Sequence, residues 1–345
     1  MPKPRTMLAI GAAVLSLGSA ALAGPEISLR EFASSQIKKG VRSIGMGGDG
    51  ATFGNYSLVY RDAGTAVLDY GLVRYGDTGD QFTFTAVGFT SPHFWDDAAL
   101  YVVAMSQHAT DVHVWSLPPP SAARPPSMGD GSNQGVFVKL AKPITSTISV
   151  GVLLSYELSQ MTLLPDGGGP PITYRTAWRP SGGAGLSWQP SSQFLFGARA
   201  LFSNDWETRT DGSPERSGLA RSYEYRLGGA FLPWDGTILD VGVAALDRSD
   251  AVDGTSTFQV APTVGAEQAI VEGHLWVRAG LDETTWTFGM SAALTPFKLD
   301  IALLRDLGVE RTGGVFGRSN LGGLATLTVD YERISGRRGT SASPR

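Results

Sequence analysis

Apolar and polar residues alternate along most of the chain between about residue 66 and residue 332. Between Thr147 and Gln160, the even-numbered positions carry Ile, Val, Leu and Tyr, and the odd-numbered positions are mostly Gly, Ser and Thr. Because successive side chains of a β-strand leave opposite faces, this stretch predicts a strand with one apolar and one polar face. The alternation returns in segments that begin at Phe194, Tyr223, Leu239, Leu275, Trp286, Phe297 and Leu327.

The polar face of these predicted strands distinguishes a membrane barrel from a soluble β protein. In a soluble sandwich or propeller that face meets water, and Lys, Glu, Asp and Arg are plentiful on it. Here it carries mostly Gly, Ser, Thr and Ala, with isolated charges of both signs. The segments are also about ten residues long, the length with which a tilted strand crosses a bilayer. The pattern therefore predicts an all-β fold, a transmembrane antiparallel β-barrel with a crowded polar lumen.

The links between the predicted strands alternate in length after a first strand at residues 66–75. Short links are expected at residues 91–97, 143–146, 189–192, 232–236, 269–272 and 295–296. Longer links are expected at residues 108–133, 161–174, 204–220, 249–256 and 306–320, with short exceptions at 76–80 and 282–283. Outer-membrane barrels have short periplasmic turns and long extracellular loops. This count gives about fourteen strands, with both ends of the barrel in the periplasm.

The composition agrees with this class and argues against others. The 345 residues include 44 Gly, 33 aromatic residues (8 Trp, 10 Tyr and 15 Phe) and no Cys, which argues against a disordered chain and a disulfide scaffold. The mean hydropathy of -0.02, with no apolar run of about 18 residues after residue 23, argues against a bundle of membrane helices. A net charge of -4 gives no reason to expect a nucleic-acid partner.

The first 23 residues have the features of a secretory signal peptide. Lys3 and Arg5 precede an apolar stretch that closes on Ala21-Leu22-Ala23, a cleavage signature of small residues. The alternative is an uncleaved anchor helix, which the small residues at the cleavage site argue against. We therefore expect export of a mature chain that starts at Gly24, and localisation in the outer membrane of a Gram-negative bacterium.

A glycine-rich segment precedes the first predicted strand. Residues 40–51 read Gly-Val-Arg-Ser-Ile-Gly-Met-Gly-Gly-Asp-Gly-Ala, and residues 60–64 read Tyr-Arg-Asp-Ala-Gly. A barrel of about fourteen strands is wider than side chains alone can fill, so either something occupies the lumen or the barrel is an open pore. Glycines allow a backbone to approach a wall closely. On the residues alone, the segment is equally compatible with a plug in the lumen and with a flexible periplasmic leader.

These two stretches resemble the start of the FadL-type outer-membrane transporters of long-chain fatty acids and hydrocarbons, and of the related PorV-like barrels. The resemblance is confined to residues 40–64, and Arg61 and Asp62 stand where the family has Asn and Pro. It implies a hatch at residues 24–64, inside the barrel, and apolar ligands that bind in the lumen and leave laterally through the wall. The residues that it assigns to the gate are Arg42, Gly45, Met46, Gly47, Gly48, Tyr60 and Asp62.

The predicted function depends on both the hatch and the lumen. We predict a channel for small hydrophobic or amphipathic compounds, of the fatty-acid or hydrocarbon class, that needs no cofactor because flux follows a gradient. Its partners are outer-membrane lipid and the hydrophobic ligand. The alternative is a PorV-like barrel that has a hatch but no transport and serves a secretion or envelope assembly. Charged residues expected to neutralise one another in the lumen are Arg199, Glu224, Arg226, Asp240, Glu267, Arg278, Lys298, Asp300 and Asp330.

Catalysis and metal binding find little support in the sequence. His108, Asp111 and His113 lie close together, but no further ligand at a known spacing accompanies them, so we predict no metal site. A barrel hydrolase is the enzyme alternative, but the Gly-x-Ser-x-Gly elbow is missing. Gly45-x-Gly47 lacks the strand and helix that flank a nucleotide loop. We therefore predict no catalytic residues.

Aromatic residues mark the predicted strand ends, where indoles favour the bilayer interface. They include Trp95, Trp178, Trp188 and Trp286. The last strand is expected to run to Glu332, which gives a barrel at residues 65–332. Outer-membrane barrels commonly finish on an aromatic residue, whereas Tyr331 is followed here by Glu332 and a basic tail. We expect this tail, residues 333–345, to be disordered in the periplasm.

Overall fold

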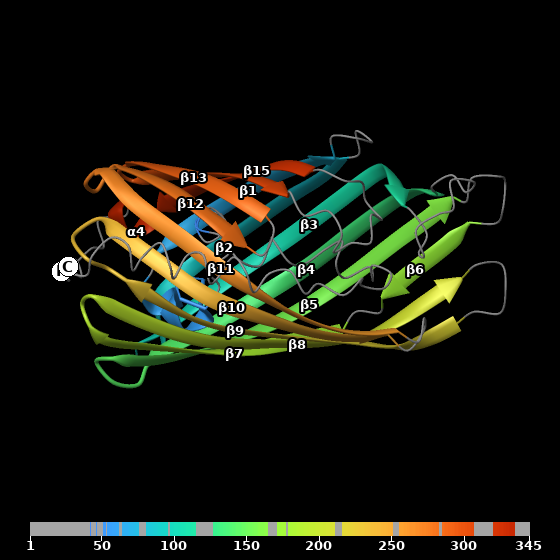
Figure 1. Cartoon of the computed structure of the whole chain (residues 1–345), viewed down its shortest axis with the longest axis horizontal. Coiled ribbons are helices and arrows are strands. Elements are labelled where there is room, and N and C mark those ends of the chain that lie inside the picture. Colours follow the sequence, from blue (N-terminus) through green and yellow to red (C-terminus); the bar gives the residue numbers. More distant parts are fainter. Residues whose placement is uncertain are drawn as a thin grey trace, which may run out of the picture.

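Strands that follow one another along the chain lie side by side in space (Figure 1). The computed structural model describes residues 42, 46, 51–52, 54–61, 64–75, 81–95, 97–114, 127–164, 171–176, 179–210, 216–250, 255–282, 285–306 and 320–334. The predicted signal peptide and most of the predicted tail lie outside these residues. The strands are β1 (Thr65–Tyr75), β2 (Gln81–Trp95), β3 (Ala98–Val114), β4 (Ser127–Pro143), β5 (Ile148–Leu164), β6 (Ile172–Thr176), β7 (Arg179–Ser191), β8 (Phe194–Thr210), β9 (Arg216–Phe231), β10 (Thr237–Asp250), β11 (Thr255–Val271), β12 (Leu275–Asp282), β13 (Thr285–Leu294), β14 (Phe297–Asp306) and β15 (Asn320–Asp330).

The sheet closes on itself because β4 pairs with β5 and so joins its two ends. β6 and β7 share one strand position, since each pairs with β5 on one side and with β8 on the other. The 15 strands of the sheet therefore fill 15 - 1 = 14 positions, and every pairing is antiparallel. The predicted fold class, a barrel of about fourteen antiparallel strands, is confirmed.

The outer face of the barrel is apolar and the inner face is buried. On β5, Val150, Val152 and Leu154 are exposed, and the residues between them are buried. The same alternation runs along β10 and β13. A surface of this kind on all sides is far larger than the apolar patches that soluble monomers expose. In lipid it is stable, because a closed barrel also leaves no unpaired sheet edge. The structure is therefore a transmembrane barrel.

Aromatic side chains gather on the outer face near the short turns. Phe196 stacks on Trp188, and Phe194 stacks on Phe196 and on Phe231. Rings at this level suit the interface between water and membrane. Two of the tryptophans expected at strand ends, Trp95 and Trp286, are exposed there. Trp178 lies outside the described residues.

The strands extend further at the long-loop end than the alternation predicts. β3 runs to Val114 and β4 begins at Ser127, although the pattern predicts a link at residues 108–133. β8 and β9 likewise continue into the predicted link at residues 204–220. The pattern fails there because a strand that leaves the bilayer no longer needs an apolar outer face, whereas its backbone pairing persists. The short links at residues 232–236 and 295–296 are confirmed.

The chain enters and leaves the barrel at the same end, since Thr65 pairs with Asp330. β15 ends at Asp330 rather than at Glu332, because a short helix, α4 (Tyr331–Ile334), begins there. The Asp330 side chain caps this helix: its Oδ1 accepts a hydrogen bond from the Arg333 N–H at 3.0 Å. Asp330, one of the charges expected in the lumen, thus caps α4. No helix among the described residues is both long and apolar enough to span a membrane.

Tyr331 ties α4 to the barrel wall. Its hydroxyl donates a hydrogen bond to the Thr90 carbonyl on β2 at 2.7 Å, and its N–H donates to the Gly64 carbonyl. Partial burial, together with the Glu332 and Asp330 carboxylates, raises the pKa of the Tyr331 phenol above its ordinary value. The hydroxyl therefore stays protonated and remains a donor at neutral pH.

Candidate functional site

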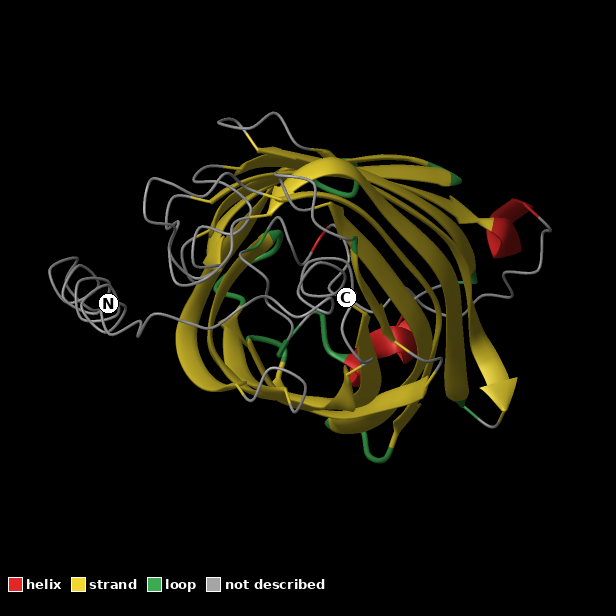
Figure 2. Cartoon of the chain, turned by 90° about the vertical axis from the view of Figure 1, so that its right-hand side faces the viewer, coloured by secondary structure: helices red, strands yellow, loops and turns green. Residues whose placement is uncertain are grey.

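The described part of the N-terminal segment lies against the inner face of the barrel. Its 3-10 helix η3, Tyr56–Arg61, packs against β2, β3, β4, β5 and β7 and lies within the ring of strands in Figure 2. Met46, Tyr56 and Ser57 are fully buried. The segment therefore occupies part of the lumen.

Glycines on the inner face of the wall make room for this segment. A Cβ placed on any of four glycines would overlap atoms of the N-terminal segment, on β5, β7, β8 and β11 in turn. Because glycine has no Cβ, the backbone of the segment approaches the wall at each of these points. The four pairs are Gly151 with Tyr56, Gly185 with Asn55, Gly197 with Ala51, and Gly265 with Met46.

Asn55 fixes the segment to two neighbouring strands. Its side-chain amide donates to the carbonyls of Leu186 on β7 and Ala198 on β8, each at 3.0 Å. Its Oδ1 accepts hydrogen bonds from the Ser57 N–H at 3.1 Å and the Ser57 hydroxyl at 3.0 Å. The Ser57 hydroxyl is also hydrogen-bonded to the hydroxyl of Ser187 on β7. These buried contacts hold the start of η3 in place.

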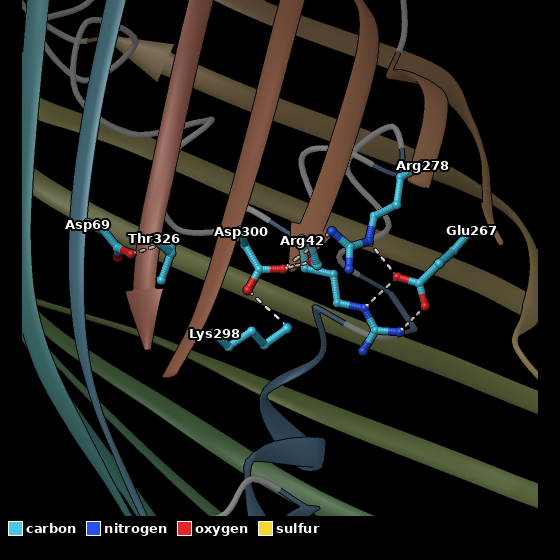
Figure 3. A network of polar contacts seen from close by, with 8 residues as sticks. Arg42, Asp69, Glu267, Arg278, Lys298, Asp300 and Thr326 are labelled. Carbon is cyan, nitrogen blue, oxygen red and sulfur yellow. Dashed lines mark hydrogen bonds and ion pairs between the residues drawn. The ribbon is translucent and has the colours of Figure 1, made fainter. Parts of the chain in front are cut away.

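A charged lumen network, defined here as Arg42, Glu267, Arg278, Lys298 and Asp300, joins the segment to the wall (Figure 3). Arg42 is bidentate to Glu267: Nη2 lies 2.7 Å from Oε1, and Nε lies 3.1 Å from Oε2. Arg278 donates to the same carboxylate, and its Nη1 lies 3.3 Å from Asp300 Oδ1. Lys298 Nζ lies 2.9 Å from Asp300 Oδ2. One carboxylate thus binds a cation of the segment and a cation of the wall, which is a strong, charge-assisted arrangement.

A second group of charges lies on β8 and β9. Arg199 Nη2 and Arg226 Nε lie 2.6 Å and 2.7 Å from the same Glu224 oxygen, Oε1. Both arginines are buried. Asp240 on β10 is buried as well and accepts a hydrogen bond from the Thr52 hydroxyl of the segment.

A cluster of buried apolar side chains, called here the apolar lumen cluster, packs against the segment on the inner wall. Its wall residues come from β2, β3, β4, β5, β14 and β15, and Tyr56 of the segment packs into it. Lys139 Nζ and Arg199 Cζ lie 5.7 Å and 5.2 Å from the centroid of the Tyr56 ring, within reach of a cation–π interaction. The wall residues of the cluster are Phe84, Ala86, Val103, Met105, Phe137, Leu153, Ala302, Leu304 and Leu324.

The structure brings seven of the nine predicted lumen charges into two groups of contacts. Arg199, Glu224 and Arg226 form one group, and the charged lumen network contains Glu267, Arg278, Lys298 and Asp300. Asp240 accepts a hydrogen bond from Thr52. Among the predicted gate residues, Arg42 and Met46 lie at the inner wall, and Tyr60 lies in η3. Gly45, Gly47, Gly48 and Asp62 lie outside the described residues. That these residues gate the lumen stays a prediction.

Sequence reasoning missed Asn55, Tyr56, Ser57 and the apolar lumen cluster. The cluster had a signal in the sequence, because residues 101–105 and 152–154 are apolar or aromatic at both odd and even positions. A strand of that kind has no polar face, so its inner face must meet apolar neighbours. The contacts of Asn55 had no comparable signal, since they depend on carbonyls of strands far along the chain.

The described residues offer binding groups rather than a metal centre. No group of three or more Asp, Glu or His side chains among them is arranged to hold a metal ion. His108 Nε2 lies 2.8 Å from Ser106 Oγ on an exposed part of β3. Within the lumen, guanidinium and hydroxyl donors lie beside apolar side chains. Such a surface can hold an apolar molecule and fix a polar group on it.

Comparison with known proteins identifies the fold. No protein-family model and no curated protein sequence matches the chain. The solved structure of the monoaromatic hydrocarbon channel CymD matches with a TM-score of 0.57 and 13% identity, over 86% of this chain and 98% of that one. A FadL homologue from Pseudomonas aeruginosa matches with a TM-score of 0.54 and 13% identity, over 85% and 98%. The chain has the FadL-type barrel fold.

A third structure agrees with this identification. The toluene transporter TodX of Pseudomonas putida matches with a TM-score of 0.54 and 11% identity, over 84% of this chain and 98% of TodX. The predicted resemblance to the FadL-type barrels is thereby confirmed at the level of the fold. In this FadL-type barrel, the charged lumen network lies near the turns that begin β12 and β14, and the apolar lumen cluster lies further along the strands.

Proposed function

We propose that this protein is an outer-membrane channel for small hydrophobic or amphipathic compounds of the fatty-acid or hydrocarbon class. Residues 24–64 form a hatch that gates its lumen, and residues 1–23 are the signal peptide that directs export. The observation that carries this proposal is the course of the described N-terminal residues along the inner wall of a FadL-type barrel. The apolar outer face of the barrel meets the lipid of a Gram-negative outer membrane.

The structures that share the fold support a hydrophobic cargo. CymD is described as a monoaromatic hydrocarbon channel, and TodX as a toluene transporter. Passage of such molecules down a gradient needs neither a cofactor nor a catalytic step. The apolar lumen cluster places apolar side chains on the inner wall, the kind of lining that such a molecule favours.

The way in which the segment is held supports its role as a hatch. Among the described residues, none between 42 and 61 pairs with a strand of the sheet. Arg42, Asn55 and Ser57 hold the segment through side-chain contacts, each of a kind worth about 0.5–3 kcal/mol. These contacts can break without opening the wall, so the hatch can move while the barrel keeps its pairing.

A disulfide lock tests this proposal. The chain has no Cys, so Ser57→Cys combined with Ser187→Cys introduces one defined pair, whose two hydroxyls are in contact in the native structure. We expect oxidation to tie η3 to β7 and to lower the uptake several-fold, and reduction to restore it. Uptake is measured with a hydrophobic fluorescent dye in intact Gram-negative cells that carry the protein in their outer membrane.

Two controls decide between the outcomes. Each single cysteine variant should be insensitive to oxidant, which excludes an effect of the oxidant on the membrane. Gly197→Val, which crowds the Ala51 carbonyl, should unseat the segment and raise the uptake. Equal uptake by the locked and the reduced protein would show that the segment is no gate. If neither the intact protein nor a deletion of residues 24–64 raises uptake above that of cells lacking the protein, the barrel is instead a scaffold of the PorV-like kind.

A further inference from the structure

A patch of polar side chains lies on the outer face of the barrel, toward the long-loop end of β2, β3 and β4. The outward positions of β3 are apolar from Leu100 to Ala104 and polar at Ser106 and His108. The residues opposite Ser106 and His108 on both neighbouring strands are polar too. This outer polar patch comprises Thr83, Thr85, Ser106, His108, Ser132 and Gln134.

The outer polar patch lies where the outer face passes from lipid to water. The outward residues next to it on the bilayer side are Val87, Ala104 and Val136, which are exposed and lie opposite one another. The outer face of a membrane barrel carries an apolar band about 25 Å tall, and the edge of that band meets the interface between acyl chains and head groups. The ester groups of glycerophospholipids lie at this interface. A lipid beside these strands therefore places its chains on the apolar residues and its esters at the patch.

Ser106 and His108 form a hydrogen-bonded pair within the outer polar patch. They are two positions apart on β3, so both side chains leave the same face of the strand. Ser106 Oγ lies 2.8 Å from His108 Nε2. A hydroxyl at this distance from an imidazole is the arrangement of a nucleophile with its general base. The prediction of no catalytic residues depended on a missing Gly-x-Ser-x-Gly elbow, which a serine exposed on a strand does not need.

A donor for the charge that develops in acyl transfer lies on the next strand. Gln134 on β4 is exposed and lies directly opposite Ser106. The Cβ atoms of directly opposed residues are about 4.5–5.5 Å apart, so the Gln134 amide is within reach of the oxyanion of an acyl group on Ser106. On the other side of β3, the hydroxyls of Thr83 and Thr85 each donate to a main-chain carbonyl of β3 at 3.5 Å. Gln134 is therefore the donor that we assign to the oxyanion.

We infer that the outer polar patch hydrolyses the esters of glycerophospholipids, in a site separate from the lumen. Ser106 Oγ attacks the carbonyl carbon of the ester and gives its proton to His108 Nε2, and Gln134 donates a hydrogen bond to the carbonyl oxygen. The bond between that carbon and the alcohol oxygen breaks, and the lysophospholipid leaves with the proton from His108. Water that gives a proton to His108 then attacks the acyl-serine. The fatty acid is released, and the same proton restores the Ser106 hydroxyl.

Release of fatty acid from vesicles tests the inference. The mature protein is reconstituted in vesicles of palmitoyl-oleoyl phosphatidylethanolamine and phosphatidylglycerol, and mass spectrometry measures free fatty acid and lysophospholipid. We expect both products in equal initial amounts, and neither from vesicles of dialkyl-ether analogues, which lack the ester. Ser106→Ala should reduce release to that of protein-free vesicles. His108→Asn should lower the rate about 10²–10⁴-fold, and Gln134→Leu about 10²–10³-fold.

A covalent probe identifies the nucleophile without turnover. A long-chain alkyl fluorophosphonate should label Ser106, as located by peptide mass spectrometry, and His108→Asn should slow the labelling. Thr110→Ala removes the next outward hydroxyl of β3 and is the matched control, which should change neither release nor labelling. The faster gel mobility of an unboiled barrel shows that each variant is folded. The inference is overturned by release no higher than that of protein-free vesicles, by equal release from Ser106→Ala and the wild type, or by absence of label on Ser106.

Discussion

The charged lumen network and the apolar lumen cluster lie on the same inner wall and hold the N-terminal segment in different ways. β14 contributes to both, with Asp300 in the network and Leu304 in the cluster. In the network each partner is specific, and removal of one charge takes a counterion from another buried charge. In the cluster the contacts are non-directional, and a lost side chain leaves a void. The segment joins the network through Arg42 and the cluster through Tyr56. The Arg42 contact is therefore a directional ion pair, and the Tyr56 contact is non-directional packing.

Removal of the central cation of the network should have the largest effect. Arg278→Met deprives the buried carboxylates of Glu267 and Asp300 of a shared partner. We expect a loss of about 3–5 kcal/mol of unfolding free energy. Tryptophan fluorescence during urea unfolding in lipid vesicles measures it. Lys298→Met is the matched control, because this half-exposed lysine touches Asp300 alone in the network and should cost far less. Equal losses in the two variants would contradict a central role for Arg278.

Truncation in the apolar lumen cluster should have the next largest effect. Leu153 is 1% exposed and faces the lumen, and Leu154 is 57% exposed and faces outward. Leu153→Ala leaves a void among packed side chains and should cost about 3 kcal/mol. Leu154→Ala gives up contact with lipid and leaves no internal void, so its cost should be clearly smaller in the same urea titration. A reversed order would mean that the cluster is loosely packed.

The contact of the segment with the network should matter more for motion than for stability. Arg42 is 40% exposed in its side chain, and Glu267 keeps Arg278 when Arg42 is lost. Arg42→Gln should therefore lower the unfolding free energy by about 1 kcal/mol or less. In a Ser57→Cys background, the same change should speed the reaction of the cysteine with a maleimide reagent. Unchanged labelling would show that Arg42 does not restrain η3.

A single neutral hydrogen bond outside both regions provides the baseline. Tyr331→Phe removes the hydroxyl that donates to Thr90 and keeps the ring. We expect a loss of about 1 kcal/mol or less, no larger than that of Arg42→Gln. The same unfolding titration measures it. A loss as large as that of Arg278→Met would mean that the end of the chain, rather than the lumen, limits the stability of the barrel.

The alternation of residues predicted the barrel because it depends on a local rule. Side chains of adjacent residues on a strand face opposite environments. The apolar Val150 is therefore expected to face lipid, and the polar Ser149 to face the lumen. The strand positions, the short turns and the apolar outer face follow from that rule. The rule applies only within the membrane. It therefore did not predict the parts of β3 and β8 that extend beyond the membrane boundary.

The contacts of the lumen do not follow from any local rule. Glu267 and Arg42 are 225 residues apart in sequence, and Thr52 and Asp240 are 188 apart. The pattern shows that these side chains face inward, yet which charge meets which depends on the shear and closure of the whole barrel. The two groups of charges and the row of glycines beneath the segment are therefore properties of the closed structure.

The sequence by itself determined that this chain is a fourteen-stranded antiparallel barrel with an apolar exterior, and it indicated a glycine-rich segment ahead of the first strand. Only the tertiary structure decided where that segment lies, what holds it, and that one side of the lumen is apolar. The physical reason is that lipid and lumen each impose a local preference on every residue along a strand, whereas ion pairs and close packing arise between residues that closure of the barrel brings together.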